Sequence, residues 1–291
     1  MITAMPSLRS CLSFAFVLAV ALLTGCSQVY FWTINAGDRD SRGETASYAP
    51  GSDQQLDVYR ARAHGPAPVV VFFYGGSWRN GQRQDYRFVG KALAERGVVV
   101  VIPDYRKAPR YPFPVFMRDA ASAVAWTRAN IGRYGGDPTR IFVMGHSAGG
   151  QIAALLATDA EYLAAVGMRP RDLAGVIGLA GPYDFLPIVD PKIKAVFGAE
   201  KDWPRSQPVN FVDGDEPPFL LLHGASDTTV RPMNSEHLAT KLQAQRESVV
   251  LKIVPATGHI GLLSGFASPR FSPVLEDSLD WISATDSRGT H

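Results

Sequence analysis

The stretch IFVMGHSAGGQIAALL, residues 141–156, contains a strand pattern, a glycine-rich turn and a helix pattern in direct succession. Four consecutive apolar residues at its start are typical of a strand that is covered on both faces. Ile152, Leu155 and Leu156 then follow the spacing of one helix face. The stretch therefore predicts a buried strand that turns sharply into a helix, with Ser147 at the turn.

The same alternation of strand and helix continues along the chain. The apolar, β-branched runs that predict strands are Val69–Phe73, Val98–Ile102, Ile141–Met144, Val176–Leu179, Phe219–Leu222 and Val249–Val254. Helical patterns cover Tyr86–Arg96, which stops at Gly97, and Met117–Tyr134, which stops at Gly135. This order predicts an α/β, doubly wound fold with a mostly parallel sheet, whose ligands bind at the carboxyl ends of the strands.

The N-terminus has the pattern of an export signal. Arg9 precedes an apolar run over Cys11–Leu23 that is too short to span a bilayer, and small residues follow it. A cysteine directly after these residues, Cys26, makes residues 1–25 resemble a bacterial lipoprotein signal. That resemblance implies an acylated Cys26 as the membrane anchor and, because Ser27 follows, an exported protein at the outer membrane. The alternative is an ordinary signal peptide or a short anchor with a chance cysteine.

The remaining chain divides into unequal parts. Residues 26–53 are largely polar and predict a tether that leads into an edge strand near Gln55–Tyr59. Residues 54–285 predict one α/β domain, and residues 286–291 a tail. The proline-rich stretch 181–218 interrupts the strand–helix rhythm and predicts a small cap or lid over the site.

Composition excludes several kinds of site. The chain has two cysteines, one inside the signal and one at the predicted acylation position, so the mature domain has no thiol for a disulfide or a metal-thiolate site. No cluster of His, Asp and Glu shows metal-ligand spacing. The formal net charge is +2 without a run of Lys and Arg, which argues against a nucleic-acid partner. No pattern defines an oligomeric state.

The residues Gly145-His146-Ser147-Ala148-Gly149 at the turn predict a nucleophile. A sharp strand-to-helix turn needs small neighbours, raises the serine hydroxyl above the sheet and aims the N–H of Ala148 at a developing oxyanion. The helix N-terminus adds a favourable dipole. The alternative is a glycine-rich turn whose serine only caps the helix.

A serine nucleophile needs a base, and the base needs an orienting carboxylate. Asp227 follows the strand pattern at 219–222, and His259 follows the strand pattern at 249–254. In an architecture with this strand-to-helix nucleophile turn the chain order is serine, acid, histidine, and Asp227 and His259 both follow Ser147 in that order at carboxyl ends of strands.

Other acids and histidines are alternatives for the same roles. Among the histidines, His223 is expected to be structural, His146 to support the turn, and His64, His237 and His291 to be exposed. The alternative acids are Asp184, Asp213 and Asp215.

Several motifs together resemble the α/β-hydrolases. They are YGGSWRNGQ, VVVIPDYRKAPRYPFPVFMRDAASAVAW, YGGDPTRIFVMGHSAGG, LAGPYDFLP, HGASDTTV and GHIGL, in this order. Over residues 55–283 the chain resembles bacterial esterases and arylformamidases related to the hormone-sensitive-lipase group. The resemblance implies hydrolysis of small carboxylic esters or amides through an acyl-enzyme, without a cofactor. It also implies a structural role for Asp104, Tyr105 and Arg106.

One residue departs from the family pattern. Where family members usually have His-Gly-Gly, this chain has Tyr74-Gly75-Gly76. The loop is expected to supply the N–H of Gly76, with that of Ser77, to the oxyanion hole beside Ala148. Tyr-Gly-Gly resembles the prolyl-oligopeptidase-like peptidases, in which the phenol itself donates to the oxyanion. Tyr74 is therefore either a further oxyanion donor or a residue that holds the loop.

The substrate is less well defined by the sequence. Aromatic and apolar residues near the motifs are candidates to line a pocket, with ordinary core packing as the alternative: Trp78, Tyr183, Phe185, Trp203 and Ile260. A short cap favours small acyl groups. Ester hydrolysis is the expected activity, with an arylformamidase or a small-peptide or aminoacyl amidase as the alternative. A non-catalytic binding protein of the same fold is the alternative from another class.

Overall fold

The eight-stranded sheet at the centre has the strand order β1-β2-β4-β3-β5-β6-β7-β8. The computed structural model describes residues 27–35, 43–51, 53–63 and 65–286. The strands are β1 (Glu44–Ser47), β2 (Gln55–Tyr59), β3 (Ala67–Phe73), β4 (Val99–Pro103), β5 (Gly136–His146), β6 (Gly175–Leu179), β7 (Phe219–Gly224) and β8 (Val249–Val254). The β1–β2 and β2–β4 pairs are antiparallel, and every later pair is parallel. The predicted doubly wound, mostly parallel α/β fold is confirmed.

Every apolar run that predicts a strand lies in or largely within one. Strand β1, with the sequence ETAS, was not predicted because it has no apolar pattern. It pairs with β2 in the register Glu44↔Val58 to Ser47↔Gln55 at the edge of the sheet, where its side chains are largely exposed. An edge strand of this kind is formed by backbone hydrogen bonds and buries little of its own surface.

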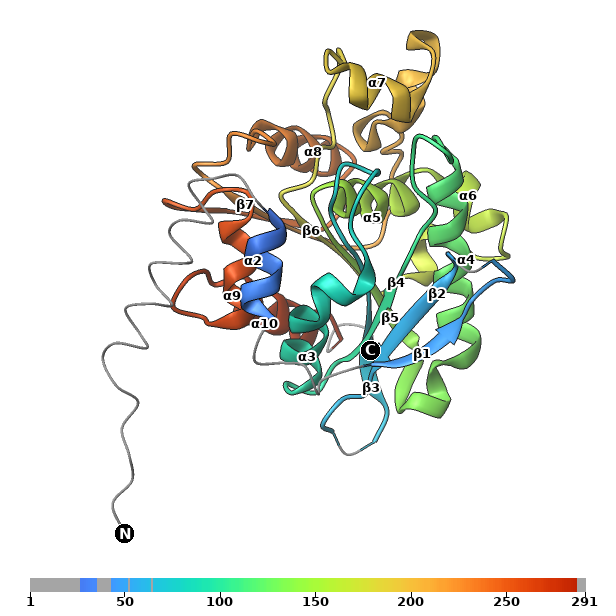
Figure 1. Cartoon of the computed structure of the whole chain (residues 1–291), viewed down its shortest axis with the longest axis vertical. Coiled ribbons are helices and arrows are strands. Elements are labelled where there is room, and N and C mark those ends of the chain that lie inside the picture. The colour runs from blue at the N-terminus through green and yellow to red at the C-terminus, as the bar shows by residue number, and fades with distance from the viewer. Residues whose placement is uncertain (1–26, 36–42, 52, 64, 287–291) are drawn as a thin grey trace.

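Helices cover both sides of the sheet (Figure 1). They are α3 (Arg87–Ala94), α4 (Val115–Asn130), α5 (Ala148–Thr158), α6 (Ala160–Ala164), α8 (Met233–Ala244), α9 (Ser264–Ala267) and α10 (Val274–Asp286). The helix predicted at 117–134 is α4 followed by a 3₁₀ turn, Ile131–Tyr134. That turn ends at Gly135, whose φ of 84° is left-handed and suits glycine.

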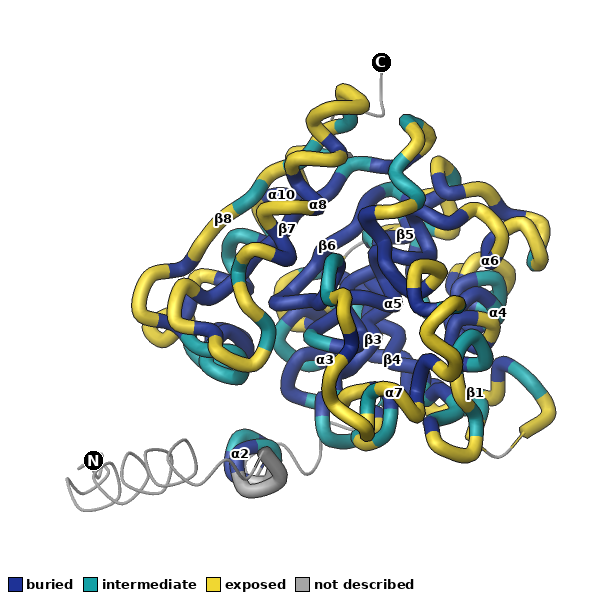
Figure 2. Tube along the Cα trace, turned by 90° about the horizontal axis from the view of Figure 1, so that it is seen from above, coloured by how far each residue is buried: buried dark blue, intermediate teal, exposed yellow. Residues whose placement is uncertain are grey.

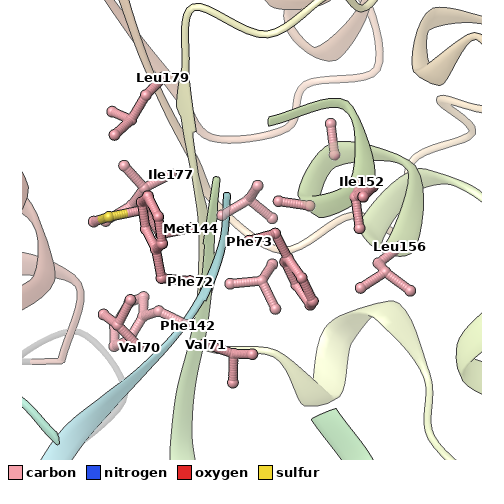
Figure 3. Packing of buried hydrophobic residues seen from close by; sticks show 14 of the residues in the cluster. Val70, Val71, Phe72, Phe73, Phe142, Met144, Ile152, Leu156, Ile177 and Leu179 are labelled. Carbon is pink, nitrogen blue, oxygen red and sulfur yellow. The ribbon is translucent and has the colours of Figure 1, made fainter. Parts of the chain in front are cut away.

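The core lies on both faces of the central strands. Figure 3 shows Val70, Phe72 and Met144 on one side of the sheet, and Val71 and Phe73 on the other, facing α5. All five side chains are fully buried. Burial on both faces explains why these strands read as continuous apolar runs. Figure 2 shows the same contrast across the molecule, with buried central strands and an exposed edge at β8.

The connection from β6 to β7 contains the predicted cap segment. Over residues 181–218 it forms α7 (Pro191–Phe197) and the 3₁₀ segments Glu200–Ser206 and Pro208–Asn210. In Figure 1 helix α7 stands beyond the carboxyl ends of the strands. The segment is therefore on the side of the sheet where the candidate site lies.

The predicted signal and Cys26 lie outside the described residues. Among the residues that the structure does describe, no helix has the length and apolar character needed to cross a membrane.

The start of the predicted tether differs from expectation, because Ser27–Ile34 forms helix α2 against the domain. The Tyr30 side chain is buried, and its hydroxyl lies 3.1 Å from the hydroxyl of Ser264. The ring centroid of Phe31 lies 4.7 Å from that of Tyr86. The aromatic side chains of Tyr30 and Phe31 thus pack this segment against the domain, although its overall composition predicts a tether.

Candidate active site

Ser147 stands at the turn between β5 and α5, as the sequence predicts. Its backbone has φ 56° and ψ −123°, a strained conformation for a residue with a side chain. A Cβ on the following Gly149 would overlap the carbonyl oxygen of Phe73, so the helix packs directly on β3. The N–H of Ala148, the first residue of α5, stands next to the serine at the helix N-terminus.

Asp227 and His259 meet although they come from different loops. The loops follow the neighbouring parallel strands β7 and β8, whose carboxyl ends share one edge. His259 Nδ1 lies 2.7 Å from Asp227 Oδ2. The other oxygen, Oδ1, accepts hydrogen bonds from the N–H groups of Thr229 and Val230, each at 2.9 Å. These contacts fix the plane of the carboxylate.

The carboxylate of Asp227 is held in its ionised form. Burial by itself raises the pKa of this group, but hydrogen bonds from His223 and His259 together outweigh burial and hold the pKa well below its ordinary value. An ionised Asp227 accepts the Nδ1 proton of His259, which leaves Nε2 of the ring as a base.

His146, the residue before Ser147, contacts His259. The two rings lie 4.7 Å apart, and His146 Nε2 donates to the backbone carbonyl of His259 at 3.1 Å. Burial and the neighbouring His259 lower the pKa of His146 to about 3, so its ring is neutral. The hydrogen bonds of the described residues do not include one from Ser147 Oγ to His259. Such contacts often tighten only when substrate binds.

The alternative acids lie in other contacts. Asp184 Oδ2 lies 2.7 Å from Nδ1 of His237, and both side chains are more than a third exposed. Asp215 pairs with Arg171 at the surface. Asp213 accepts a hydrogen bond from the N–H of Asp215.

The hydroxyl of Tyr74 has a defined partner. It donates to Asp104 Oδ1 at 2.7 Å, and the side chain is fully buried. Its ring stacks between those of Tyr105, at 4.7 Å, and Tyr86, at 5.6 Å. Burial raises the pKa of Tyr74 well above its usual value, so the phenol stays protonated. Because its one proton is directed at Asp104, the geometry favours the loop-holding role over donation to an oxyanion.

Asp104 also connects this loop to Arg83, a residue that the sequence analysis did not identify. The carboxylate accepts from the N–H of Arg83 at 3.0 Å and pairs with its guanidinium, which in turn lies 2.9 Å from Asp57. A polar turn such as NGQRQD gives no signal for a buried arginine. The next residues have structural contacts: Tyr105 donates to the carbonyl of Tyr74, and Arg106 pairs with Asp119.

The Tyr74 loop runs directly against the serine. A Cβ on Gly75 would lie 3.1 Å from Ser147 Cβ and 3.1 Å from His146 Nδ1, which is tight, so the absence of a side chain allows the approach. Gly76 follows with a φ of 130°, and Ser77 has a φ of 54°. The N–H groups of Gly76 and Ser77 are thus candidates to face a substrate at Ser147.

Trp78 is buried between the loop and the cap. Its Nε1 donates to Gln151 Oε1 at 2.9 Å, one helical turn after Ser147, and Gln151 donates to the carbonyl of Ser206 in the cap. The Trp78 ring lies 4.8 Å from that of Phe197 on α7. Gln151 is not predicted as a site residue from the sequence, although an amide at the apolar start of α5 is an unusual residue there.

The other predicted pocket residues divide between core and surface. Tyr183 is fully buried with its ring against Gly178 and Gly181, so it is a core residue and does not line a pocket. Trp203 is buried within the cap, where Nε1 donates to the carbonyl of Gly198. Phe185 and Ile260 are partly exposed, and the Phe185 ring lies 5.8 Å from that of Trp78.

Within the described ranges, no three His, Cys, Asp or Glu side chains are grouped in a way that could hold a metal ion. The chemical groups present are a strained serine, an imidazole hydrogen-bonded to an ionised carboxylate, and backbone N–H groups. These are the groups that acyl transfer requires.

The parallel sheet and the strand-to-helix turn at Ser147 define an α/β-hydrolase fold. The chain belongs to the BD-FAE family, whose model matches residues 56–242. Esterase LipC of Mycobacterium tuberculosis is 33% identical over 75% of this chain and 60% of its own length. The chain thus spans about three fifths of this curated relative.

Solved structures give the same fold. Inhibited esterase B from Lactobacillus rhamnosis superimposes with a TM-score of 0.77 at 19% identity, over 95% of this chain and 98% of that one. A truncated carbohydrate esterase from gut microbiota gives a TM-score of 0.74 at 21% identity, over 86% of this chain and 98% of that one. At these identities the likeness concerns the fold alone.

Proposed function

We propose that this protein is a serine hydrolase that cleaves small carboxylic esters through an acyl-enzyme. The observation that carries the proposal is the 2.7 Å contact of His259 with Asp227, beside the strained turn of Ser147. The proposal is supported by the family and by relatives whose names describe esterases. A site built only to bind has no need of an imidazole held on a buried, ionised carboxylate.

In the first half-reaction Ser147 Oγ attacks the ester carbonyl carbon while His259 Nε2 takes the hydroxyl proton. The N–H groups of Ala148, Gly76 and Ser77 stabilise the negative charge on the carbonyl oxygen. The tetrahedral intermediate collapses when His259 gives that proton to the leaving alcohol, and the acyl group stays on Ser147.

In the second half-reaction His259 takes a proton from water, and the resulting nucleophile attacks the acyl carbon. Collapse returns the proton to Ser147 Oγ and releases the carboxylic acid. Asp227 stays ionised throughout and stabilises the imidazolium in both steps. These steps use the chain's own residues and water.

A serine-reactive fluorophosphonate probe tests the nucleophile. Labelling of the wild type and not of Ser147→Ala supports the proposal. Mass spectrometry of the labelled peptide should place the probe on Ser147. Labelling of neither protein supports a binding protein. A panel of p-nitrophenyl esters of graded acyl length, N-formyl aryl amides and aminoacyl amides then defines the substrate, and faster turnover of either amide class than of every ester would contradict ester hydrolysis.

We also propose that the protein is exported and acylated at Cys26, with the lipid as its membrane anchor. The short positive region, the apolar run and the small residues before Cys26 support this proposal.

A further inference from the structure

The buried imidazole of His223 has polar contacts at both ring nitrogens. Its side chain is fully buried at the carboxyl end of β7. Nε2 lies 2.8 Å from the carbonyl oxygen of Val230 and 3.3 Å from Asp227 Oδ2. Nδ1 lies 2.7 Å from the hydroxyl of Ser235 on α8. His223 therefore contacts the same carboxylate oxygen that His259 uses.

These contacts define where the proton of His223 is. A carbonyl oxygen and an ionised carboxylate only accept hydrogen bonds, so Nε2 must carry the proton. In this tautomer Nδ1 accepts from the hydroxyl of Ser235. The other neutral tautomer is excluded, because its Nε2 lone pair would face two acceptor atoms, the carbonyl oxygen of Val230 and Oδ2 of Asp227.

We propose that His223 is a positioning residue for the acyl transfer, which acts by holding the Asp227 carboxylate against His259. This inference rests on the function proposed above. Asp227 is clamped on both oxygens: the backbone N–H groups of Thr229 and Val230 hold Oδ1, and His223 shares Oδ2 with His259. His223 also contacts the backbone carbonyl of Val230 in the loop that carries Asp227. One ring therefore contacts both the acid and its loop.

The contact has a consequence for the base. A donor on Asp227 Oδ2 withdraws part of the negative charge that His259 would otherwise face. When this donor is removed, the carboxylate stabilises the protonated form of His259 more strongly. The imidazole must be neutral to accept the serine proton, and the acid limb of the kcat/KM profile therefore moves to higher pH. His146 also lies against His259, and its lowered pKa keeps that ring neutral over this pH range.

The test is the pH profile of kcat/KM for p-nitrophenyl acetate in wild type, His223→Leu and His223→Gln. We expect His223→Leu to move the acid limb up by about half a unit to one unit, with kcat/KM lower by about tenfold on the plateau. The Gln amide can place an N–H where Nε2 stands, so His223→Gln should keep the limb near its wild-type position.

Leu238→Ala is the matched control. Leu238 is fully buried on α8, the helix that carries Ser235, so this substitution should loosen the packing of that helix without removing a contact of His223. It should lower the melting temperature without moving the limb. If His223→Leu does not fold, His223→Met replaces it, because a flexible apolar side chain can fill the space of the ring without supplying a donor, and it should move the limb in the same direction.

An unmoved limb in His223→Leu, or in His223→Met where that variant replaces it, overturns the positioning role. So does an equal shift in Leu238→Ala. The proposed function fails differently: the wild-type protein would then neither react with the fluorophosphonate probe nor hydrolyse the ester.

Discussion

At the scale of single residues, Tyr74 shows how one hydroxyl can decide between two mechanisms. Its sequence context resembles that of peptidases whose tyrosine donates to the oxyanion. In the structure the hydroxyl faces Asp104, and the carbonyl of Tyr74 is held by Tyr105. A phenol has one proton to give, so the bond to Asp104 makes Tyr74 a support of the glycine loop.

We expect Tyr74→Phe to lower the free energy of unfolding by about 1–3 kcal/mol, because Asp104 loses a buried donor. The ring stacking and the Tyr105 bond to the loop remain, so kcat should fall by less than about threefold, against the 10²–10³ that loss of an oxyanion donor costs. Chemical unfolding and steady-state kinetics on small esters measure both effects. Tyr105→Phe is the matched variant, and a larger loss of kcat in Tyr74→Phe than in Tyr105→Phe would revive the donor role.

The neutral His146 predicts a dependence of stability on pH. Its pKa is about 3 in the folded protein and 6.5 as the ordinary value. A histidine with a depressed pKa binds its proton more tightly in the unfolded chain, so its contribution to stability is complete above pH 6.5 and is lost as the pH falls toward 3.

We expect the free energy of unfolding of wild type to fall more steeply below pH 6.5 than that of His146→Gln, which can still donate to the carbonyl of His259. Denaturant unfolding between about pH 5 and pH 6.5 compares the two, since most carboxylates do not titrate there. Identical slopes would mean that His146 is not a neutral buried ring.

Among the secondary-structure elements, helix α2 packs near two parts of the candidate site, the segment that follows His259 and the aromatic cluster around Tyr74. Tyr30 contacts Ser264 on α9, shortly after His259 in the chain. Phe31 packs on Tyr86, whose ring stacks on Tyr74. The family match begins at residue 56, so α2 lies outside the matched part of the chain.

We expect Phe31→Ala to destabilise the protein by about 2 kcal/mol, because a partly buried ring leaves an aromatic cluster. Phe271→Ala is the control, since that ring is 59% exposed and its loss should change the melting temperature little. Equal melting temperatures for wild type and both variants would show that α2 adds nothing to the fold. Thermal unfolding followed by circular dichroism is sufficient.

The sequence predicted the elements unevenly. Strands β3, β4, β6 and β7, and the second half of β5, are apolar on both faces, so their sequences alone distinguish them from loops. The sequence did not predict β1 or α2. The first is a polar edge strand formed by backbone bonds, and the second is a short helix whose aromatic residues have meaning only beside Tyr86 and Ser264.

At the scale of the whole molecule, acylation would join the membrane to a docked helix, since Cys26 directly precedes α2 in the sequence. We expect the full-length protein to fractionate with membranes and to carry a mass increase of two or three acyl chains, because one chain alone binds membranes only marginally. Cys26→Ala should lose the added mass. A wild-type protein that is cleaved elsewhere and carries no lipid would contradict the proposal.

The sequence by itself determined the α/β order and the position of Ser147 at a strand-to-helix turn. It also determined that Asp227 and His259 follow later strands. These follow from local periodicity and small residues, which act within a few positions of the chain. Only the tertiary structure decided that Tyr74 bonds to Asp104, that His223 shares the Asp227 carboxylate, and that Tyr183 belongs to the core. Such pairings join side chains far apart in the chain, and their directions depend on how the sheet and its loops pack.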